Sequence, residues 1–305
     1  MDFFKKFISY KGGYNEQFPS HNFHSFEFFK YYCFEGYTSI NFPIMHFGRQ
    51  KESNEKTSLI KYYKNSGFIT SNCYDLCDKA PTRSYHNYTY DEMYDHLFSL
   101  CDINNEHMSS ARIRCLYGKQ TIEHLTEYTD QFWRKYSDNR KYASIMTNHA
   151  HEATMNILKY TDDVIFNFLN NLFNDNLLKD TSIIMLSDHG LQLPSIYFFY
   201  DFYRTEKQLP ILAMIINDRK GVSYEEQYEH MRENQQTFLT GFDIYNTLVN
   251  IVFGDKYNVM KANEGEQQEA YISKNGISLF DKINPMTRSP KVYNEISPMD
   301  GFSCK

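Results

Sequence analysis

Apolar residues in the second half of the chain follow two different periodicities, and together they predict an α/β fold. Short, wholly apolar runs predict strands that are buried on both faces of a sheet. Longer segments with an apolar residue at every third or fourth position predict helices with one buried face. Strands are expected at residues 142–146, 181–187 and 209–218, and helices at 153–178 and 240–254. This alternation favours a mainly parallel sheet with helices on both faces.

The first half of the chain alternates aromatic segments with polar loops. Residues 25–48 predict a strand and a second element, joined by a turn near Gly36. Residues 58–78 predict a helix and then a short strand, separated by Gly67. Helical spacing of apolar residues also predicts helices at 90–102 and 118–138.

The composition excludes several classes of protein. The net charge is −6, and the basic residues are scattered, so nucleic acid is not an expected partner. No stretch approaches the roughly 20 apolar residues of a membrane-spanning helix, and the first residues lack the apolar segment of a secretory signal. No internal repeat is present. A single domain over 1–305 is therefore expected, with an aromatic-rich part (1–140), a core (141–255) and a tail (256–305).

Two successive predicted strands end in side chains that can bind metal ions. One leads into His149 and His151, and the next leads into Asp188 and His189. Ligands of open α/β sheets gather at the carboxyl ends of strands, so these residues would surround one point if the strands are neighbours. A carboxylate with two or three imidazoles is the ligand set that zinc and similar divalent ions prefer.

Both motifs also have a plain structural interpretation. Asp188-His189-Gly190 could form an ordinary turn, and His149 and His151 could be surface or core histidines. Their joint occurrence at successive strand ends favours a site over the plain interpretation.

Segments along nearly the whole chain resemble, in order, motifs of the alkaline phosphatase/sulfatase superfamily, and more narrowly of its eukaryotic sulfatase-like branch of unknown function. Residues 180–190, which end in Ser-Asp-His-Gly, resemble the metal-ligand motif of that superfamily. The other matching segments are 29–49, 65–78, 205–218, 234–252 and 275–283, followed by Arg288 and Cys304. Ser-Asp-His-Gly alone is only moderately specific, whereas the ordered set is much more so.

The resemblance implies hydrolysis or transfer of a phosphate or sulfate ester, on a small molecule, a glycan or a lipid. In such enzymes one or two divalent metals polarise the ester oxygens and activate a Thr, Ser or modified-Cys nucleophile. Asp188 and His189 would ligate the metal beside the nucleophile, and His151 or His149 would serve a second metal or the leaving group. Zinc is the expected ion, with calcium, magnesium and manganese as alternatives. The resemblance also implies a secretory or extracellular location.

The sequence has no counterpart of the family's nucleophile. The family's nucleophile lies on an N-terminal strand and turn, and residues 2–7 resemble the Phe-rich segment that follows it. The sequence thus predicts an alkaline phosphatase-like sheet whose first strand is missing, and no catalytic nucleophile in this chain. Thr38 and Ser39 lie in a turn that does not hold the nucleophile in the family. Tyr245 also stands where relatives often carry His.

Two functions stay open at this point. The first is a metal-dependent ester hydrolase or transferase domain that is incomplete. The second is a catalytically inactive relative that acts by binding. The absent nucleophile strand favours the second, and the retained Asp188-His189 pair favours the first.

Overall fold

A computed structural model describes most of the chain, and all structural statements below concern that part. The described residues are 23–34, 36–49, 58–75, 94–100, 115–151, 157–190, 201–217, 225–262 and 269–289. The strands are β1 (Phe23–Glu27), β2 (Tyr31–Tyr32), β3 (Ile69–Tyr74), β4 (His96–Ser99), β5 (Cys115–Leu116), β6 (Lys119–Gln120), β7 (Lys141–Met146), β8 (Ile183–Leu186), β9 (Leu212–Asn217) and β10 (Leu239–Thr240). The helices are α1 (Thr38–Phe47), α2 (Leu59–Asn65), α4 (Thr121–Lys135), α5 (Leu158–Asn174), α6 (Asp201–Gln208), α7 (Glu225–Asn234), α8 (Gly241–Phe253) and α9 (Lys256–Ala262), with a 3₁₀ turn at Pro285–Thr287.

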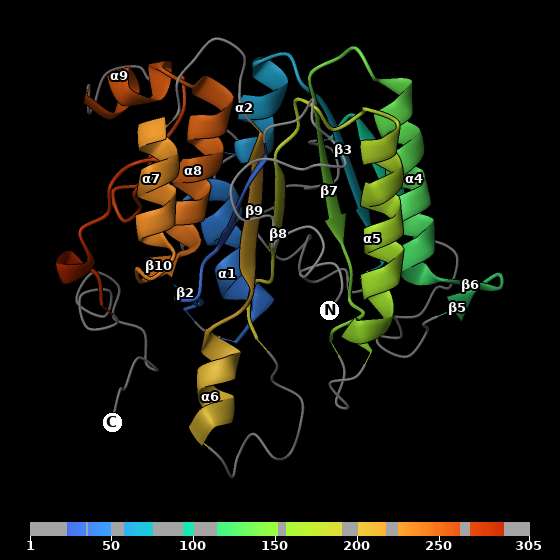
Figure 1. Ribbon diagram of the computed structural model, residues 1–305, viewed down its shortest axis with the longest axis horizontal. Coiled ribbons are helices and arrows are strands. Elements are labelled where there is room, and N and C mark those ends of the chain that lie inside the picture. Colours follow the sequence, from blue (N-terminus) through green and yellow to red (C-terminus); the bar gives the residue numbers. More distant parts are fainter. Residues whose placement is uncertain are drawn as a thin grey trace.

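Two three-stranded sheets form the centre of the molecule (Figure 1). One has the order β4-β3-β7, and all of its strands are parallel. The other has the order β1-β9-β8, and β9 runs antiparallel to both neighbours. Strands β1 and β8 therefore run in the same direction, and β9 between them runs in the opposite one. The predicted α/β class is confirmed.

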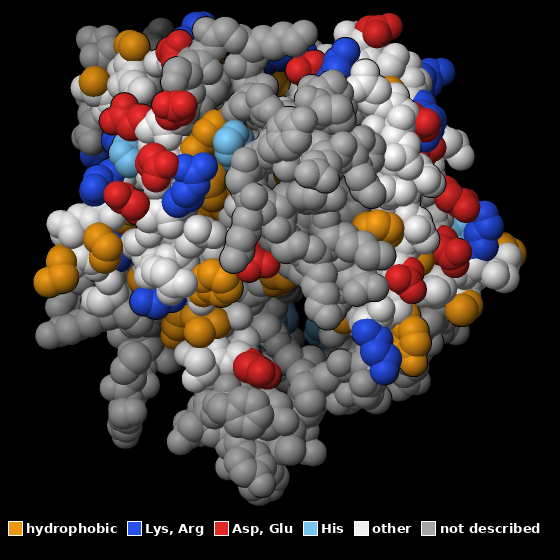
Figure 2. All heavy atoms as spheres, in the orientation of Figure 1, with side chains coloured by type: hydrophobic (Ala, Val, Ile, Leu, Met, Phe, Trp, Pro, Cys, Tyr) orange, Lys and Arg blue, Asp and Glu red, His pale blue; other side chains and the backbone are white. Residues whose placement is uncertain are grey.

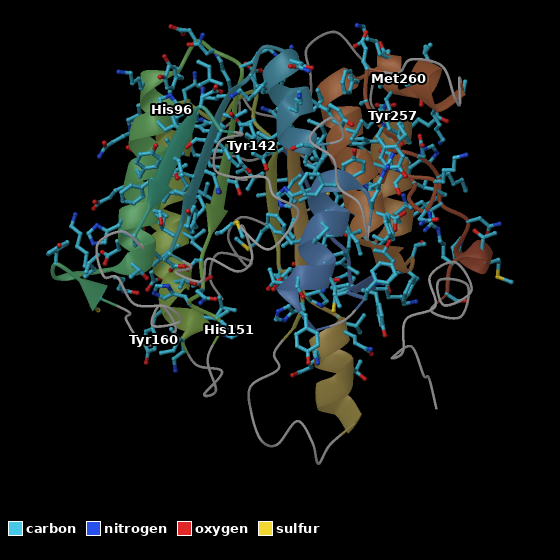
Figure 3. The ribbon with its side chains drawn as sticks, turned by 180° about the vertical axis from the view of Figure 1, so that it is seen from behind. His96, Tyr142, His151, Tyr160, Tyr257 and Met260 are labelled. Carbon is cyan, nitrogen blue, oxygen red and sulfur yellow. The ribbon has the colours of Figure 1, made fainter. Side chains whose placement is uncertain are left out.

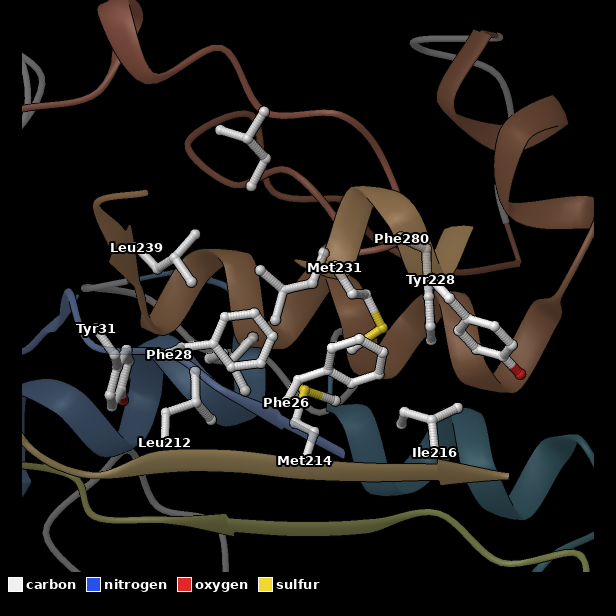
Figure 4. Packing of buried hydrophobic residues seen from close by; sticks show 13 residues of the cluster. Phe26, Phe28, Tyr31, Leu212, Met214, Ile216, Tyr228, Met231, Leu239 and Phe280 are labelled. Carbon is white, nitrogen blue, oxygen red and sulfur yellow. The ribbon is translucent and has the colours of Figure 1, made fainter. Parts of the chain in front are cut away.

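Strand β9 shows why its segment is apolar throughout. Leu212, Met214 and Ile216 belong to one buried cluster with side chains of α7 and α8, as Figure 4 shows. Ala213 and Ile215 point to the opposite face, where they share a cluster with α5. Successive side chains of a strand alternate between faces, so helices on both faces require every one of these residues of β9 to be apolar.

Strands β7 and β8 form the facing edges of the two sheets. Within the described residues β7 pairs with β3 alone, and β8 pairs with β9 alone. Every residue of β7 and β8 is half-buried, whereas every residue of β9 is buried. In Figure 1 both strands run downward, so that their carboxyl ends open on the same lower edge of the molecule. The candidate metal ligands predicted from the sequence follow these two strands: His149 and His151 come after β7, and Asp188 and His189 come after β8.

Most predicted elements are confirmed, and the exception is informative. Helix α8 begins after Thr240, which forms a capping box with Asp243, and ends at Gly254 as expected. The helix predicted at 90–102 is wrong for residues 96–99, which form β4 and pair with β3. A segment of four residues is too short for its apolar pattern to distinguish a helix from a strand. Here the hydrogen bonds to β3 stabilise the extended conformation.

No described helix has both the length and the apolar character needed to cross a bilayer.

Candidate active site

Asp188 and His189 lie in the turn directly after β8. The backbone N–H of Ser187 donates to the carbonyl of Ile211, and that of Gly190 donates to the carbonyl of Lys207 at 2.7 Å. A Cβ on Gly190 would lie 1.9 Å from the backbone oxygen of Glu206. Only glycine fits so close to another backbone, and this contact holds the turn against the end of α6.

The hydrogen bonds around His189 determine which ring nitrogen carries its proton. Nδ1 lies 2.7 Å from the carbonyl oxygen of Gly190, which can only accept, so Nδ1 is the donor. In the neutral ring Nε2 then carries a lone pair, and it lies 3.6 Å from Oδ2 of Asp188. That oxygen is buried and has no hydrogen-bond partner among the described residues. A buried carboxylate oxygen of Asp188 and the lone pair of His189 Nε2 therefore face each other.

A hydroxyl group completes this arrangement. Oγ1 of Thr38 lies 3.5 Å from Nε2 of His189, and it donates to that nitrogen because Nε2 is the acceptor. Thr38 is the first residue of α1, where free backbone N–H groups and the helix dipole favour a negative charge. Nothing in the sequence pattern pairs Thr38 with His189, because 151 residues separate them.

The distances from Nε2 of His189 to the other two atoms are close to those between ligands of one metal ion. An ion bound tetrahedrally at about 2.0–2.1 Å from each ligand separates neighbouring ligands by about 3.3–3.4 Å. The two separations from Nε2 of His189 are 3.5 Å to Thr38 and 3.6 Å to Asp188. The bond from Nδ1 to the Gly190 carbonyl is also the outer contact that metal-bound histidines usually make. The residues present therefore fit a divalent cation.

His149 is not part of this group, and it lies in a second cluster at the end of β7. Its Nδ1 is 3.4 Å from Oδ2 of Asp75, the residue that follows β3. The hydroxyls of Thr121 and Thr147 donate to the same oxygen at 3.1 and 3.0 Å. The side chains of Asp75 and His149 are only 5% and 2% exposed. Asp75 was not among the site residues predicted from the sequence. The predicted strand ended at Ser71, whereas β3 continues to Tyr74 and so places Asp75 directly at its carboxyl end.

His151 lies beyond His149 at the lower edge of the molecule (Figure 3). It is half-buried, and its backbone N–H donates to the carbonyl of Asn148. In the described part of the chain, no three His, Cys, Asp or Glu side chains gather closely enough to hold one ion. The expected convergence of His151 with Asp188 and His189 is therefore not found there.

The two clusters belong to the same face of the molecule. Figure 2 shows a hollow between the two halves, below the middle of the view, with histidine side chains visible at its depth. Asp75, Thr147 and His149 follow β3 and β7 on one side, and Asp188 and His189 follow β8 on the other. Polar side chains thus follow the carboxyl ends of the strands in both sheets.

Cys33 lies close to Asp188, but it is a poor nucleophile. Its Sγ donates to the carbonyl of Lys207 at 3.2 Å, and the residue is buried. Burial, helped by the negative charge of Asp188, raises the pKa of the Cys33 thiol to about 12. The thiol is therefore protonated at physiological pH, which removes it as a candidate for the attacking group.

We expect Cys33 to resist alkylation by iodoacetamide in the native protein at pH 8. With a pKa of about 12, only about 1 in 10,000 of its thiols is ionised at that pH. Cys115 is exposed and should be modified. Peptide mapping by mass spectrometry before and after unfolding in urea measures both. Modification of Cys33 as fast as Cys115 in the folded protein would contradict the burial argument.

A family model supplies the relationship of this chain to known proteins. The model described as "Protein of unknown function (DUF229)" matches residues 45–292. The chain belongs to this family. A search of the curated proteins finds no match.

Solved structures similar to this DUF229 member share its fold. A protein of the alkaline phosphatase superfamily from Vibrio parahaemolyticus is 15% identical with a TM-score of 0.50, over 75% of this chain and 58% of that one. The C-terminal periplasmic domain of phosphoethanolamine transferase EptC from Campylobacter jejuni is 13% identical with a TM-score of 0.52, over 77% and 82%. The lipoteichoic acid synthase LtaP from Listeria monocytogenes is 9% identical with a TM-score of 0.55, over 86% and 68%.

These structures establish the fold of the chain. It is the fold of the alkaline phosphatase superfamily, as the sequence resemblance implied. The chain spans little more than half the length of the Vibrio protein. At identities of 9–15% the likeness concerns the fold alone.

Proposed function

We propose that this chain is a divalent-metal-dependent domain that hydrolyses or transfers phosphate or sulfate esters. The observation that carries the proposal is the group formed by Oδ2 of Asp188, Nε2 of His189 and Oγ1 of Thr38. The Asp188 oxygen is buried without a hydrogen-bond partner in the described residues, and it faces the lone pair of an imidazole. A bound cation relieves that electrostatic conflict.

Each of the three residues has a role in this proposal. Asp188 and His189 hold the cation, whose chemistry when bound is to polarise the ester and to lower the pKa of a bound hydroxyl. Thr38 supplies that hydroxyl: its oxygen forms a bond to the phosphorus or sulfur atom and its proton goes to solvent. The bond from that atom to the leaving oxygen breaks, and the leaving group takes a proton from solvent and departs as an alcohol. The backbone N–H groups at the start of α1 face the charge that develops on the ester oxygens.

The names of two neighbours with the same fold support the proposed class of substrate. EptC is named as a phosphoethanolamine transferase and LtaP as a lipoteichoic acid synthase. These names support a phosphate ester of a small molecule, glycan or lipid, and the resemblance of the sequence to sulfatase-like proteins adds a sulfate ester as the alternative. The oxygen and nitrogen ligands suit zinc, with manganese, magnesium and calcium as alternatives. The periplasmic EptC domain supports a secretory or extracellular location.

The test combines metal analysis with assays on aryl phosphates and aryl sulfates. We expect the chain loaded with zinc or manganese to turn over one of the two ester classes. Thr38→Val should abolish turnover, and Thr38→Ser should retain part of it. Ser39→Ala is the matched control, because Ser39 is exposed and next to Thr38. Mass spectrometry of the quenched reaction should find the transferred group on the peptide that contains Thr38.

Two outcomes would count against the proposal. Turnover by Thr38→Val at the wild-type rate would remove Thr38 as the nucleophile. Metal binding without turnover of any ester would favour the binding protein that lacks catalysis. One observation supports this non-catalytic alternative: the described residues contain no third His, Cys, Asp or Glu close enough to complete a metal site.

A further inference from the structure

Lys207, in the last turn of α6, contacts both parts of the candidate active site. Its carbonyl oxygen accepts from the backbone N–H of Gly190 at 2.7 Å and from the thiol of Cys33 at 3.2 Å. These two bonds hold its backbone against the turn that follows β8 and carries the candidate metal ligands. Helix α6 lies directly below α1, which provides the hydroxyl of the site (Figure 3). The contacts of the Lys207 side chain lie on the α1 side.

The side chain of Lys207 runs over a glycine toward the start of α1. A Cβ on Gly36 would lie 1.5 Å from Cε and 2.6 Å from Nζ of Lys207. Gly36 is buried, so a larger residue at this position would displace the lysine. Nζ lies 5.3 Å from the centroid of the Tyr37 ring, which is a cation–π contact. The ammonium therefore lies beside the two residues that immediately precede Thr38.

The ammonium, Thr38 and Asp188 lie in one region of the molecule. The contact with Gly36 and the length of two residues of chain place Nζ within about 11 Å of Cα of Thr38. The thiol of Cys33 is close to both charges: burial is the largest cause of its raised pKa, the charge of Asp188 raises the pKa further, and the charge of Lys207 lowers it. The carboxylate and the ammonium thus lie near the same sulfur atom.

We propose that the ammonium of Lys207 binds a non-bridging oxygen of the ester that reacts with Thr38, and that its charge makes the site prefer a phosphate monoester to a sulfate ester. This inference rests on the proposed function. A phosphate monoester carries about −1.5 to −2 charges at neutral pH, whereas a sulfate ester carries a single negative charge. The Coulomb energy beside a fixed positive charge is proportional to the charge of the anion. Lys207 therefore stabilises the bound phosphate ester more than the bound sulfate ester.

The test measures the affinity of the zinc-loaded protein for two anions of nearly the same shape. Phenylphosphonate carries nearly two negative charges at pH 8, and benzenesulfonate carries one. Lys207→Met keeps an unbranched side chain over Gly36 and removes the charge. We expect the affinity for phenylphosphonate to fall about 10–100-fold, the effect of a lost hydrogen bond to a charged group. The affinity for benzenesulfonate should fall only about 3–10-fold, because it has half the charge.

Gly36→Ala provides a second variant with the net charge of the wild type. Its new Cβ would overlap Cε of Lys207, which is near the end of a flexible side chain, so the ammonium is displaced and the backbone is kept. We expect both affinities to change in the same direction as in Lys207→Met. Lys179→Met is the matched control, because Lys179 is exposed and precedes β8, at the opposite end of that strand from Asp188. Isothermal titration calorimetry measures the affinities, and circular dichroism shows which variants fold.

Neither anion has an ester bond that can be hydrolysed, so this binding test is independent of turnover. Equal losses for the two anions in a folded Lys207→Met protein would show a structural role and overturn the preference for phosphate. Unchanged affinities in that variant, in a chain that turns over an ester, would overturn the inference and leave the proposed function standing. A wild-type protein that turns over no ester, but whose phenylphosphonate affinity depends on Lys207, would overturn the proposed function and keep Lys207 as an anion-binding residue.

Discussion

Replacing Asp188 with asparagine is expected to lower the zinc affinity of the chain by more than about 100-fold, without lowering the stability of the metal-free protein. Loss of partners outside the ligand shell already costs about 10–100-fold, and Asp188 would be a direct ligand. In the metal-free Asp188→Asn protein, the new side-chain amide can donate to Nε2 of His189, where the carboxylate now faces a lone pair. The substitution therefore separates metal binding from folding.

Thermal unfolding with and without zinc measures both effects. The wild-type protein should gain stability with increasing zinc, because a ligand that binds only the folded state shifts the equilibrium toward it. Asp188→Asn should lose that gain and keep the metal-free unfolding temperature. Asp180→Asn, which changes an exposed acid just before β8, should behave as wild type. A destabilised Asp188→Asn protein that still binds zinc would show that Asp188 has a structural role instead.

The largest loss of stability is expected from Asp243→Ala. Asp243 is fully buried and combines three tasks. It caps α8 by accepting from the N–H and hydroxyl of Thr240, and it accepts from the N–H of Ile277 at 2.8 Å. It also forms an ion pair at 3.0 Å with Arg288, whose side chain is 7% exposed. One carboxylate thus ties the C-terminal segment 269–289 to α8.

The expected cost of Asp243→Ala is about 3–5 kcal/mol in the free energy of unfolding, because removing one member of a buried ion pair leaves the other charge out of water without its counter-ion. Loss of the helix cap alone accounts for about 1 kcal/mol of that. Urea unfolding followed by circular dichroism measures the change. Glu233→Gln breaks an exposed pair with Lys282 and should cost less than about 1 kcal/mol. Equal costs for the two variants would refute the argument from burial.

Local pattern was sufficient to predict most elements, because a helix or a strand depends on periodicity over a few residues. Strand β7 was expected at 142–146 and occupies 141–146. The stop at Gly67 is confirmed by its φ of +81°, which glycine adopts without strain. Strand β4 was missed because its four residues carry too little pattern, and their pairing with β3 decides their conformation. The antiparallel direction of β9 likewise has no local signal.

The candidate site divides in the same way. The sequence named Asp188, His189, His149 and His151 as strand-end residues that can bind metal, and their role in metal binding stays a prediction. It could not name the partner of each side chain. His149 lies against Asp75, 74 residues away, rather than against Asp188. Thr38 lies beside His189, although the family resemblance had set it aside.

The sequence by itself determined the class of the fold and the chemical character of the residues at the strand ends, since both follow from the local order of apolar and polar side chains. Only the tertiary structure decided which of these residues meet. The physical reason is that a hydrogen bond or a metal site depends on distances of a few ångströms. Those distances are set by how the sheets and helices pack, and α1 and β8 come together only through that packing.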